Sequence, residues 1–592
     1  MMMLISHSLQ FPLALQPFSS SRFGVKTTYN NHGIIRPSSS INVNQISDQD
    51  VVDLRRSADY HPTIWDPKLI QSLTTSYTYE VHGNRLDKLK EQVRTLLKST
   101  KDVSILLKLI DSIQRSGVAY HFIHEIDAVF DHISSCVSNG TGLSTTALRF
   151  RLLRQRGHFV NTNIFNEFKD ENGNFLDSLS SDLEGLLNLY ESSFIGMCGE
   201  DTDIDEARDF SMKHLKSFVL TNSDDHNAGM RNKVNDALSD PLHWRIPRLE
   251  ARNFINLFKD SNGICSSILL ELATLDYNLV QSIHQEEVKE LTKWWKNLGF
   301  QENLSFSRDR MMENYLWALG FVYEPQYSNI RKTVTKYICI FSAIDDIFDI
   351  YGSLDELELF VKAVERWDLK AMDDLPQYMK ICYLAMYNFG NETSYDVLRD
   401  HNMVVIEFVK NEWERLCRSY LTEARWFYGG YEPSPEEYME NAWISVGGHG
   451  AIVHACLLLG LSPLNESSLD SFSSLSGPLY WSCLITRLSN DMGTSKVEIA
   501  RGDVPKSIQN YMMHKSVSEK EAKDIINCMI KHSWKKLNET NIKRSCHAIV
   551  TTLSLNMTRA ALSIYQHGDG IGTSTGLTKD RLTSLIVEQI PI

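Results

Sequence analysis

Apolar residues recur at helical spacing along most of the chain from about residue 85 onward. In the first such stretch, Leu86, Leu89, Val93 and Leu97 lie three or four positions apart, which places them on one face of an α-helix. Alternating Val-rich runs bounded by Asn-Gly turns, the mark of hairpin strands, are nearly absent. The pattern predicts an all-α protein, and no period of about 34 or about 40 residues indicates a solenoid.

The length of 592 residues favours more than one domain, because a domain typically holds about 100–200 residues. The turn Asp260-Ser-Asn-Gly263 is the best boundary. We therefore expect an N-terminal helical, α-barrel-like domain at residues 51–265 and a C-terminal helical domain at residues 266–592. Residues 220–237 are rich in Asn and Asp, and we expect them to form a loop between helices.

The first 47 residues contain nine Ser and no Asp or Glu, and their only basic residues are Arg22, Lys26 and Arg36. This bias is typical of an organellar transit peptide, which we place at residues 1–50, with the plastid stroma as the destination. The alternative is a plain disordered tail. A secretory signal is disfavoured because Ser, His and Gln interrupt the first apolar residues.

The formal charge is −14, with 60 basic and 74 acidic residues, which argues against nucleic acid as a partner. An anionic small substrate would need a local cluster of cations or metal ions. No apolar run approaches the roughly 18 residues of a membrane span. The ten Cys residues form no CxxC pair, which disfavours a zinc ribbon or a thioredoxin-type site.

Three aspartates follow a largely apolar run, in the sequence Ile344-Asp-Asp-Ile-Phe-Asp349. On a helix, Asp345 and Asp349 share a face, and Asp346 lies about 100° around the axis. Carboxylates at the end of a buried helix are costly unless a cation neutralises them, and their oxygens suit Mg²⁺. Alone the motif is weak, because a solvated acidic helix end has the same sequence.

A second oxygen-rich cluster strengthens the case. Asn490, Thr494 and Glu498 are spaced i, i+4, i+8, so on a helix an amide, a hydroxyl and a carboxylate form one stripe. Cations accompany the two clusters: Arg308 and Arg310 precede the first, and Arg487 and Lys506 flank the second. Mg²⁺ binds one or two carboxylates together with phosphate oxygens, and Arg binds phosphate oxygens well. The combination favours a diphosphate substrate.

These residues resemble the motifs of class I terpene synthases. Arg55-Arg56, followed by eight residues and Trp65, resembles the tandem-arginine motif of plant monoterpene synthases. The resemblance runs from about Arg55 to Pro591 and is carried by further motifs: Leu242-His-Trp-Arg245, Arg248-Leu-Glu-Ala-Arg252, Leu275-Asp-Tyr-Asn278, Ser307-Arg-Asp-Arg310, Glu423-Ala-Arg-Trp426, Arg501-Gly-Asp-Val-Pro-Lys506 and Tyr565-Gln-His-Gly-Asp569.

The resemblance implies two helical domains, of which the C-terminal one has the class I terpenoid synthase fold and carries the active site. It implies that the first segment, with Arg55, Arg56 and Trp65, caps that site. It also implies three Mg²⁺ ions, with Mn²⁺ as a substitute: two held by Asp345, Asp346 and Asp349, and one by Asn490, Thr494 and Glu498. Asp491 is not expected to be a ligand. The diphosphate would be bound by Arg308, Arg310, Arg487 and Lys506.

The activity implied is ionisation of geranyl diphosphate, isomerisation and cyclisation of the cation, and release of a monoterpene plus diphosphate. Trp317 and Tyr565 match family positions that face the cation, although core packing explains Trp317 equally well. Tyr565 and Asp569 are candidates for proton removal, with diphosphate as the alternative base. We also expect Gly447 and Gly448 to break a buried helix whose carbonyls face the cation.

Two departures from the family pattern are Asn253-Phe254, where Trp-Phe is frequent, and Ile571, where His is frequent. His449, between the glycines, has no explanation from the sequence. We expect a monomer or a homodimer.

Several alternatives stay open. The enzyme could release an acyclic product such as linalool, myrcene or ocimene, or be a sesquiterpene synthase acting on farnesyl diphosphate. A prenyl-chain elongating enzyme is disfavoured because it typically carries aspartate-rich motifs on both helices. Protonation-initiated cyclisation needs an Asp-x-Asp-Asp string, which is absent. A non-enzymatic helical scaffold with a decayed site is disfavoured because every metal-ligand position holds an oxygen donor.

Overall fold

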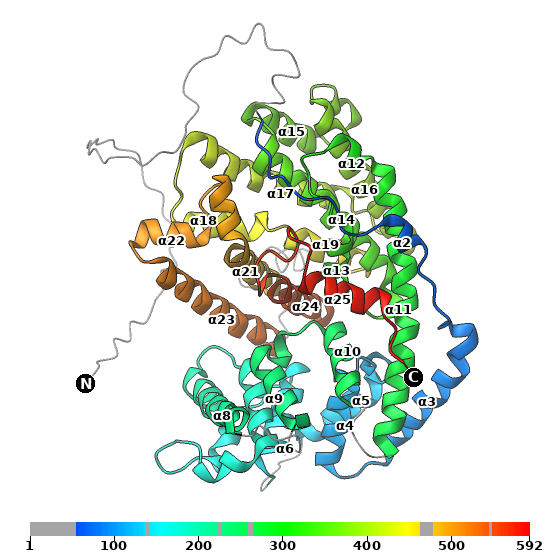
Figure 1. The fold of residues 1–592 in the computed structure, drawn as a ribbon, viewed down its shortest axis with the longest axis vertical. Coiled ribbons are helices and arrows are strands. Elements are labelled where there is room, and N and C mark those ends of the chain that lie inside the picture. The colour runs from blue at the N-terminus through cyan, green and yellow to red at the C-terminus, as the bar shows by residue number, and fades with distance from the viewer. Residues whose placement is uncertain are drawn as a thin grey trace. The chain divides into compact units, whose positions relative to one another are not determined.

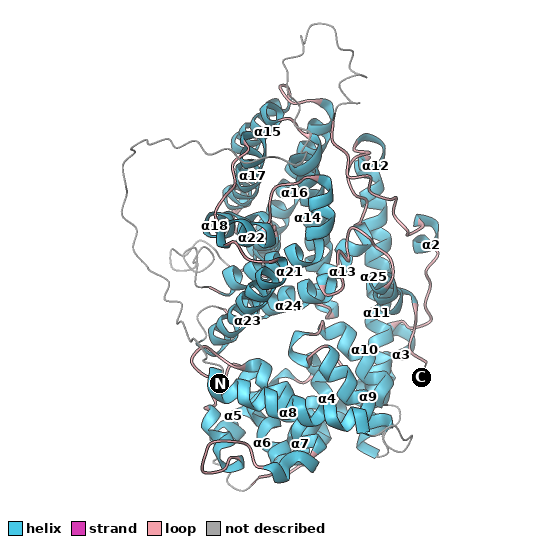
Figure 2. Cartoon of the chain, turned by 60° about the vertical axis from the view of Figure 1, so that its left-hand side comes forward, coloured by secondary structure: helices cyan, strands magenta, loops and turns pink. Residues whose placement is uncertain are grey.

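The computed structural model describes residues 55–135, 141–221, 228–258, 264–461, 477–543 and 547–591. These residues form helices joined by loops (Figure 2), and within these ranges an isolated bridge between Lys169 and Phe175 is the only β-type pairing. The predicted all-α class is confirmed. The predicted transit peptide at residues 1–50 lies outside the described ranges.

The N-terminal part of the described chain consists of helices that, apart from the first, pack in apolar clusters of their own. Their bounds are α2 (Pro67–Gln71), α3 (Tyr79–Ser99), α4 (Val103–Arg115), α5 (Ile123–Ser135), α6 (Leu143–Gln155), α7 (Leu183–Ser192), α8 (Asp201–Thr221), α9 (Ala228–Ser239) and α10 (Pro247–Phe258). Ile70 of the first helix, α2, is buried in the larger core.

The remaining helices surround a second, larger core. Their bounds are α11 (Ile264–Leu298), α12 (Phe300–Asn303), α13 (Met311–Phe321), α14 (Ser328–Asp346), α15 (Leu354–Arg366), α16 (Gln377–His401), α17 (Ile406–Gly429), α18 (Pro435–Ser445), α19 (Gly448–Leu458), α21 (Pro478–Arg501), α22 (Ser507–Lys515), α23 (Glu519–Lys543), α24 (Ala548–Tyr565) and α25 (Leu577–Leu582). A π-helical turn, η9 (Ile347–Tyr351), continues α14, and another, η11 (Thr583–Val587), continues α25.

The helical periodicity in the sequence corresponds to buried faces. Leu86, Leu89, Val93 and Leu97 of α3 are all buried in the N-terminal core. The apolar residues of α4 do not all lie on its buried face. Ile110 is fully buried, whereas Ile105 is 60% exposed. The predicted faces thus pack helices against one another, and single apolar residues outside a face stay in solvent.

Helix α11 belongs to both cores. Its first half contributes Leu272 and Leu275 to the N-terminal core, and its second half contributes Val288 and Leu291 to the C-terminal core. Figure 1 shows this long helix beside α3 in one part of its length and beside α13 and α14 in another. The predicted boundary at residues 265/266 stays a prediction, and residues 259–263 lie outside the described ranges.

The loop predicted at residues 220–237 is wrong over most of its length. Helix α8 continues to Thr221, and α9 begins at Ala228. Val234 and Ala237 of α9 are buried. Two apolar residues one turn apart are sufficient to anchor an otherwise polar helix, because tertiary packing outweighs a composition rich in Asn and Asp.

The break predicted at Gly447 and Gly448 is confirmed. Helix α18 ends at Ser445, α19 begins at Gly448, and Gly447 between them has φ of +74°, a left-handed conformation that glycine adopts without strain. The break lies against α14 and α21, which flank α19.

No helix in the part of the chain that the structure describes is both long enough and apolar enough to cross a membrane.

Gly450→Ala should destabilise the protein, because the new Cβ would overlap the hydroxyl of Tyr337, a ring that is itself fully buried. We expect a loss of about 1–3 kcal/mol, as for other overpacked cores. Gly229→Ala in α9 is the matched control: no atom of the described residues lies within 4 Å of its new Cβ, so the helix should gain about 0.5–1 kcal/mol. Thermal unfolding followed by circular dichroism measures both. An unchanged midpoint for Gly450→Ala would contradict the packing described here.

Candidate active site

A cavity of about 120 Å³ lies inside the C-terminal core, between α13, α14, α19, α21 and α24. One end is polar and is lined by both oxygen-rich clusters and by cationic side chains. The other end is apolar and is lined by Trp317, Phe321, Ile338, Phe341 and Met557. The fold therefore brings together the two predicted motifs, Asp345–Asp349 and Asn490–Glu498, whose outermost residues are 153 positions apart.

The first cluster lies where α14 changes into the π-helical turn η9. Asp345 is near the end of α14, and Asp349 is inside η9; both line the cavity, as their spacing predicts. π-Turns are frequent at functional sites because the extra residue re-aims a side chain. Burial raises the pKa of the Asp349 carboxyl, which makes its ionised form dependent on a nearby cation.

Asp346 lines the cavity and has partners that the sequence does not predict. Its carboxylate is fully buried and accepts hydrogen bonds from the Ser307 hydroxyl at 2.9 Å, the Arg308 backbone N–H at 2.9 Å and Arg308 Nε at 3.0 Å. Its assignment as a metal ligand stays a prediction. In this structure Asp346 positions Arg308, whose guanidinium also contacts Asp345 and lines the cavity.

The second cluster lies on α21. Asn490, Thr494 and Glu498 all line the cavity, so the predicted stripe faces it. Burial raises the pKa of Glu498 to about 7, and its Oε2 atom is buried without a hydrogen-bond partner among the described residues. Asp491, on the other side of the helix, is fully buried and accepts a hydrogen bond from the Tyr438 hydroxyl at 2.9 Å.

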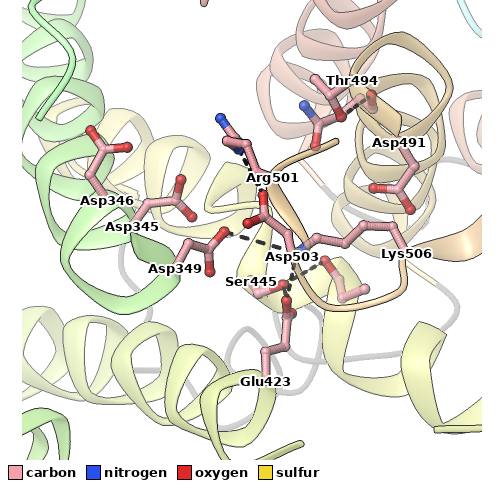
Figure 3. A network of polar contacts seen from close by, with 12 residues as sticks. Asp345, Asp346, Asp349, Glu423, Ser445, Asp491, Thr494, Arg501, Asp503 and Lys506 are labelled. Atoms are coloured by element: carbon pink, nitrogen blue, oxygen red, sulfur yellow. Dashed lines mark hydrogen bonds and ion pairs between the residues drawn. The ribbon is translucent and has the colours of Figure 1, made fainter. Parts of the chain in front are cut away.

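Lys506 lies beside the first cluster and pairs with a residue whose role the sequence does not assign, Glu423 of α17. The Lys506 Nζ atom lies 3.0 Å from Glu423 Oε2 and 4.0 Å from Asp349 Oδ2 (Figure 3). Burial alone would lower the pKa of Lys506, but Glu423 and Asp349 raise it well above its ordinary value. Glu423 also accepts a hydrogen bond from the Ser445 hydroxyl at 2.5 Å. The network thus neutralises a buried cation beside Asp349.

Arg487 spans the helix break and the second cluster. Its Nε donates at 3.1 Å to the carbonyl of Ala442, a buried residue in the last turn of α18. Its Nη1 donates to Asn490 Oδ1 at 3.0 Å. Arg487 also lines the cavity, so the structure supports a position suited to binding an anion there.

The segment of residues 55–66, which we call the cap segment, is held against the polar end by its two arginines. Arg55 forms an ion pair with Glu356 of α15 at 2.8 Å. Arg56 donates to the Asp349 carbonyl at 2.9 Å and pairs with Asp503 at 2.5 Å. The predicted cap is thus anchored directly at the first acidic cluster.

Two cavity residues in this region have no predicted role. Tyr60 of the cap segment lines the cavity, and its ring lies 5.4 Å from the Arg308 guanidinium and 6.0 Å from that of Arg501. Arg501 also lines the cavity and pairs with Asp503 at 2.8 Å (Figure 3). Both residues occur inside motifs that the sequence does contain, but only the folded chain shows which members of a motif face inward.

Arg310 does not line the cavity, and its role as a diphosphate ligand stays a prediction. Its guanidinium is buried and donates to the backbone carbonyls of His61 at 3.0 Å, Ile571 at 3.1 Å and Gly572 at 3.0 Å. Its N–H donors are therefore occupied by backbone carbonyls of two segments that cover the cavity, one containing His61 and the other containing Ile571 and Gly572. Asp569 and Ile571, in the second of these segments, do line the cavity.

The apolar end has aromatic faces. The ring centroids of Trp317 and Tyr565 lie 6.1 Å apart, and both rings line the cavity. Gly447 and Gly448 lie on the same wall, where a Cβ on Gly448 would approach Met557 at 2.8 Å. His449, between the two, points away into α17: its Nδ1 lies 2.7 Å from Glu412 Oε2. The structure therefore explains His449 as an attachment of the helix break to α17.

The donor set fits Mg²⁺ that is completed by substrate. In the described ranges, no three His, Cys, Asp or Glu side chains converge closely enough to hold a metal ion by themselves. Mg²⁺ commonly takes one or two carboxylates together with phosphate oxygens and waters, so incomplete protein sites are expected. Asp345 and Asp349 are suited to hold metal on one side of the cavity, and Asn490, Thr494 and Glu498, through its Oε2 atom, on the other.

Comparisons with known proteins agree with this geometry. The sequence profile described as "Terpene synthase, N-terminal domain" matches residues 64–238, and "Terpene synthase family, metal binding domain" matches residues 296–536. The chain belongs to the terpene synthase family. The resemblance seen in the motifs and the enzyme class, a lyase, are thereby confirmed, and this terpene synthase carries the metal-binding domain of its family.

Similar proteins extend over nearly the whole chain. "Probable terpene synthase 9" of Ricinus communis is 54% identical over 544 residues, covering 90% of this chain and 91% of the relative. "Trans-ocimene synthase, chloroplastic" of Litsea cubeba is 48% identical over 560 residues and covers 94% of each chain.

Solved structures confirm the fold. Limonene synthase with 2-fluorolinalyl diphosphate superposes with a TM-score of 0.86 at 37% identity, covering 91% of this chain and 100% of that one. Isoprene synthase from grey poplar, in complex with three Mg²⁺ ions and dimethylallyl-S-thiolodiphosphate, has a TM-score of 0.79 at 36% identity, covering 89% and 99%.

Inorganic diphosphate together with Mg²⁺ should raise the unfolding temperature of this terpene synthase more than either component alone, because each completes the binding site of the other. A ligand at one hundred times its Kd adds about 2.7 kcal/mol of stability. Glu498→Ala should remove most of the joint effect, whereas Asp524→Ala, which removes an exposed carboxylate on α23, should leave it intact. Differential scanning fluorimetry measures the shifts, and equal shifts in both variants would refute the assigned site.

Proposed function

We propose that this terpene synthase is a monoterpene synthase that converts geranyl diphosphate into a monoterpene and diphosphate in an Mg²⁺-dependent reaction. The observation that carries the proposal is the division of the cavity: a polar end with oxygen ligands and cations, and an apolar end closed by aromatic rings and a helix break. A diphosphate fits the first end and a short isoprenoid chain fits the second. The limonene synthase structure, which contains a fluorinated linalyl diphosphate, supports a diphosphate of this kind as the substrate.

The polar end is suited to ionise the C–O bond without a nucleophile from the enzyme. Bound Mg²⁺ supplies positive charge that stabilises the diphosphate as it leaves. The three Mg²⁺ ions in the isoprene synthase complex support the same number here, held by Asp345, Asp349, Asn490, Thr494 and Glu498, with Mn²⁺ as a substitute. Arg308, Arg487, Arg501 and Lys506 line this end and are oriented in advance by their carboxylate partners, so they stabilise developing negative charge with little reorganisation.

The apolar end protects the allylic cation. Its rings tolerate positive charge through their quadrupoles, with Trp317 and Tyr565 placed on one wall. Of the two predicted proton acceptors, Tyr565 is the poorer one, because burial raises the pKa of its hydroxyl well above the ordinary value. Asp569 is a carboxylate that lines the cavity, although it also accepts hydrogen bonds from the backbone N–H groups of Ile571 and Gly572. We therefore assign proton removal to Asp569 or to the released diphosphate.

The product is cyclic in the main proposal, because Arg55 and Arg56 are in place beside the first cluster. An acyclic product is the second candidate, and the names of the trans-ocimene and myrcene synthases among its relatives favour it. Use of farnesyl diphosphate is the less favoured alternative. The chloroplastic relatives and the transit-like first 47 residues support a plastid location. Whether the enzyme is a monomer or a homodimer stays a prediction.

Turnover of geranyl diphosphate should require Mg²⁺ and stop with EDTA. Asp345→Ala should lower kcat by at least about 100-fold, the scale of losing one group that stabilises developing charge, while the helical circular dichroism signal stays the same. Gas chromatography of products from geranyl and farnesyl diphosphate measures the metal dependence and the activity of the variant, and it identifies the product. Product formation without metal, or full activity of the variant, would contradict the proposal.

Replacing Arg55 and Arg56 by Ala should reduce cyclic products from geranyl diphosphate by about tenfold, as loss of about 1.4 kcal/mol in the isomerisation step implies. Cyclic products from linalyl diphosphate, which is already isomerised, should fall much less. The comparison is the ratio of cyclic product formed from the two substrates. Equal losses from both would show that the pair only stabilises the cap segment.

A further inference from the structure

Two segments from opposite ends of the chain cover the cavity. One is the cap segment, residues 55–66, and the other is the loop at residues 566–576, which we call the C-terminal loop. The cap segment contributes Tyr60 to the cavity wall, and the C-terminal loop contributes Asp569 and Ile571. The dryness of the cavity therefore depends on both segments being in place at once.

Glu313, in the first turn of α13, contacts both segments with the same oxygen atom. Its Oε1 accepts a hydrogen bond from the Trp65 indole N–H at 2.9 Å and another from the Ser574 hydroxyl. Glu313 and Ser574 are fully buried, and Trp65 is 7% exposed. Glu313 does not line the cavity, so its contacts serve the covering segments rather than the substrate.

Two further contacts join the same segments. Arg310, three residues before Glu313, donates to the carbonyl of His61 in the cap segment and to those of Ile571 and Gly572 in the C-terminal loop. The His61 imidazole Nε2 lies 2.7 Å from the Thr573 carbonyl oxygen. The start of α13 is thus the point at which both segments are attached, and neither can leave without breaking contacts of the other.

We propose that Glu313 is a positioning residue that joins the cap segment and the C-terminal loop into a single lid, and that this lid decides whether the carbocation loses a proton or captures water. The inference rests on the proposed function. With the lid closed, a C–H bond of the cation breaks, an alkene forms, and the proton goes to the base. With the lid loosened, a water oxygen forms a C–O bond with the cationic carbon and then loses a proton, giving an alcohol.

The acceptor atom, rather than the negative charge, is the important property of Glu313. Both donors use Oε1, and Oε2 is buried without a hydrogen-bond partner among the described residues. A Gln side chain keeps a carbonyl oxygen for the same two donors, whereas Leu has a similar shape and no acceptor. The pair Glu313→Gln and Glu313→Leu therefore separates lid closure from charge.

The experiment measures the ratio of alcohol to hydrocarbon products from geranyl diphosphate with Mg²⁺. Trp65→Phe and Ser574→Ala each remove one donor to Glu313 and leave the rest of their segment unchanged. Each should raise the ratio by about tenfold, and Glu313→Leu should raise it at least as much. Glu313→Gln should keep the wild-type ratio. Trp534→Phe is the matched control, because this indole is buried in a separate apolar cluster and has no hydrogen-bond partner among the described residues.

A second measurement does not depend on turnover. Hydrogen exchange of peptides that cover residues 566–576 should accelerate in Trp65→Phe, although the two sites are about 500 positions apart in sequence. It should not accelerate in Trp534→Phe. This measurement keeps the inference testable even if Glu313→Leu fails to fold.

The outcomes separate the two proposals. If the wild-type enzyme converts no prenyl diphosphate, the proposed function fails, while faster exchange in Trp65→Phe still shows the coupling of the two segments. If the enzyme is active but the product ratio and the exchange are unchanged in Trp65→Phe and Ser574→Ala, the lid role of Glu313 is overturned. An increase in Glu313→Gln equal to that in Glu313→Leu would also overturn it, since the effect would then follow charge.

Discussion

The cavity depends on the pairing of buried carboxylates with buried cations. Lys506 pairs with Glu423 beside Asp349, Arg308 pairs with Asp346, and Arg487 lies 3.3 Å from Asp491. An unpaired charge at any of these positions would be expensive, because ions lose their hydration in the protein interior. The first two pairs attach the loops before α22 and α13 to α17 and α14, the third lies within α21, and all three cations line the cavity. A chain of net charge −14 thereby builds a site for an anion.

Much of the fold and part of the site could be predicted from the sequence because both follow from helical geometry. Spacing alone places Asn490, Thr494 and Glu498 on one face, and the fold points that face into the cavity. Spacing cannot say which partners each member of a motif meets. Asp346 and Arg310 belong to the right motifs, yet one binds Arg308 and the other binds backbone carbonyls of covering segments. Those partners are distant in sequence and become neighbours only after folding.

The same limit explains the residues whose roles the sequence does not assign. Glu423, Arg501 and Tyr60 become site residues through contacts with Lys506, Asp503 and Arg308. Glu423 and Arg501 belong to motifs in the sequence, but a motif alone does not show which of its members reach the cavity. The prediction of a loop around α9 was wrong for a related reason. The polar composition indicated a loop, but two buried residues on one face hold this segment as a helix. Local rules describe the faces of helices, and long-range packing decides what each face meets.

The packing of helix α11 limits how the N-terminal and C-terminal halves of related enzymes can be exchanged. One continuous helix of 35 residues packs into both cores. A chimera of two related enzymes that is joined just before α11 would therefore pair α11 of one parent with the N-terminal core of the other. Complementary packing on that interface would be lost even if each half came from a stable enzyme. Exchanges that keep α11 together with its neighbours on both sides preserve the interface. Because the packing of both cores depends on α11, the two halves of the molecule cannot be exchanged independently.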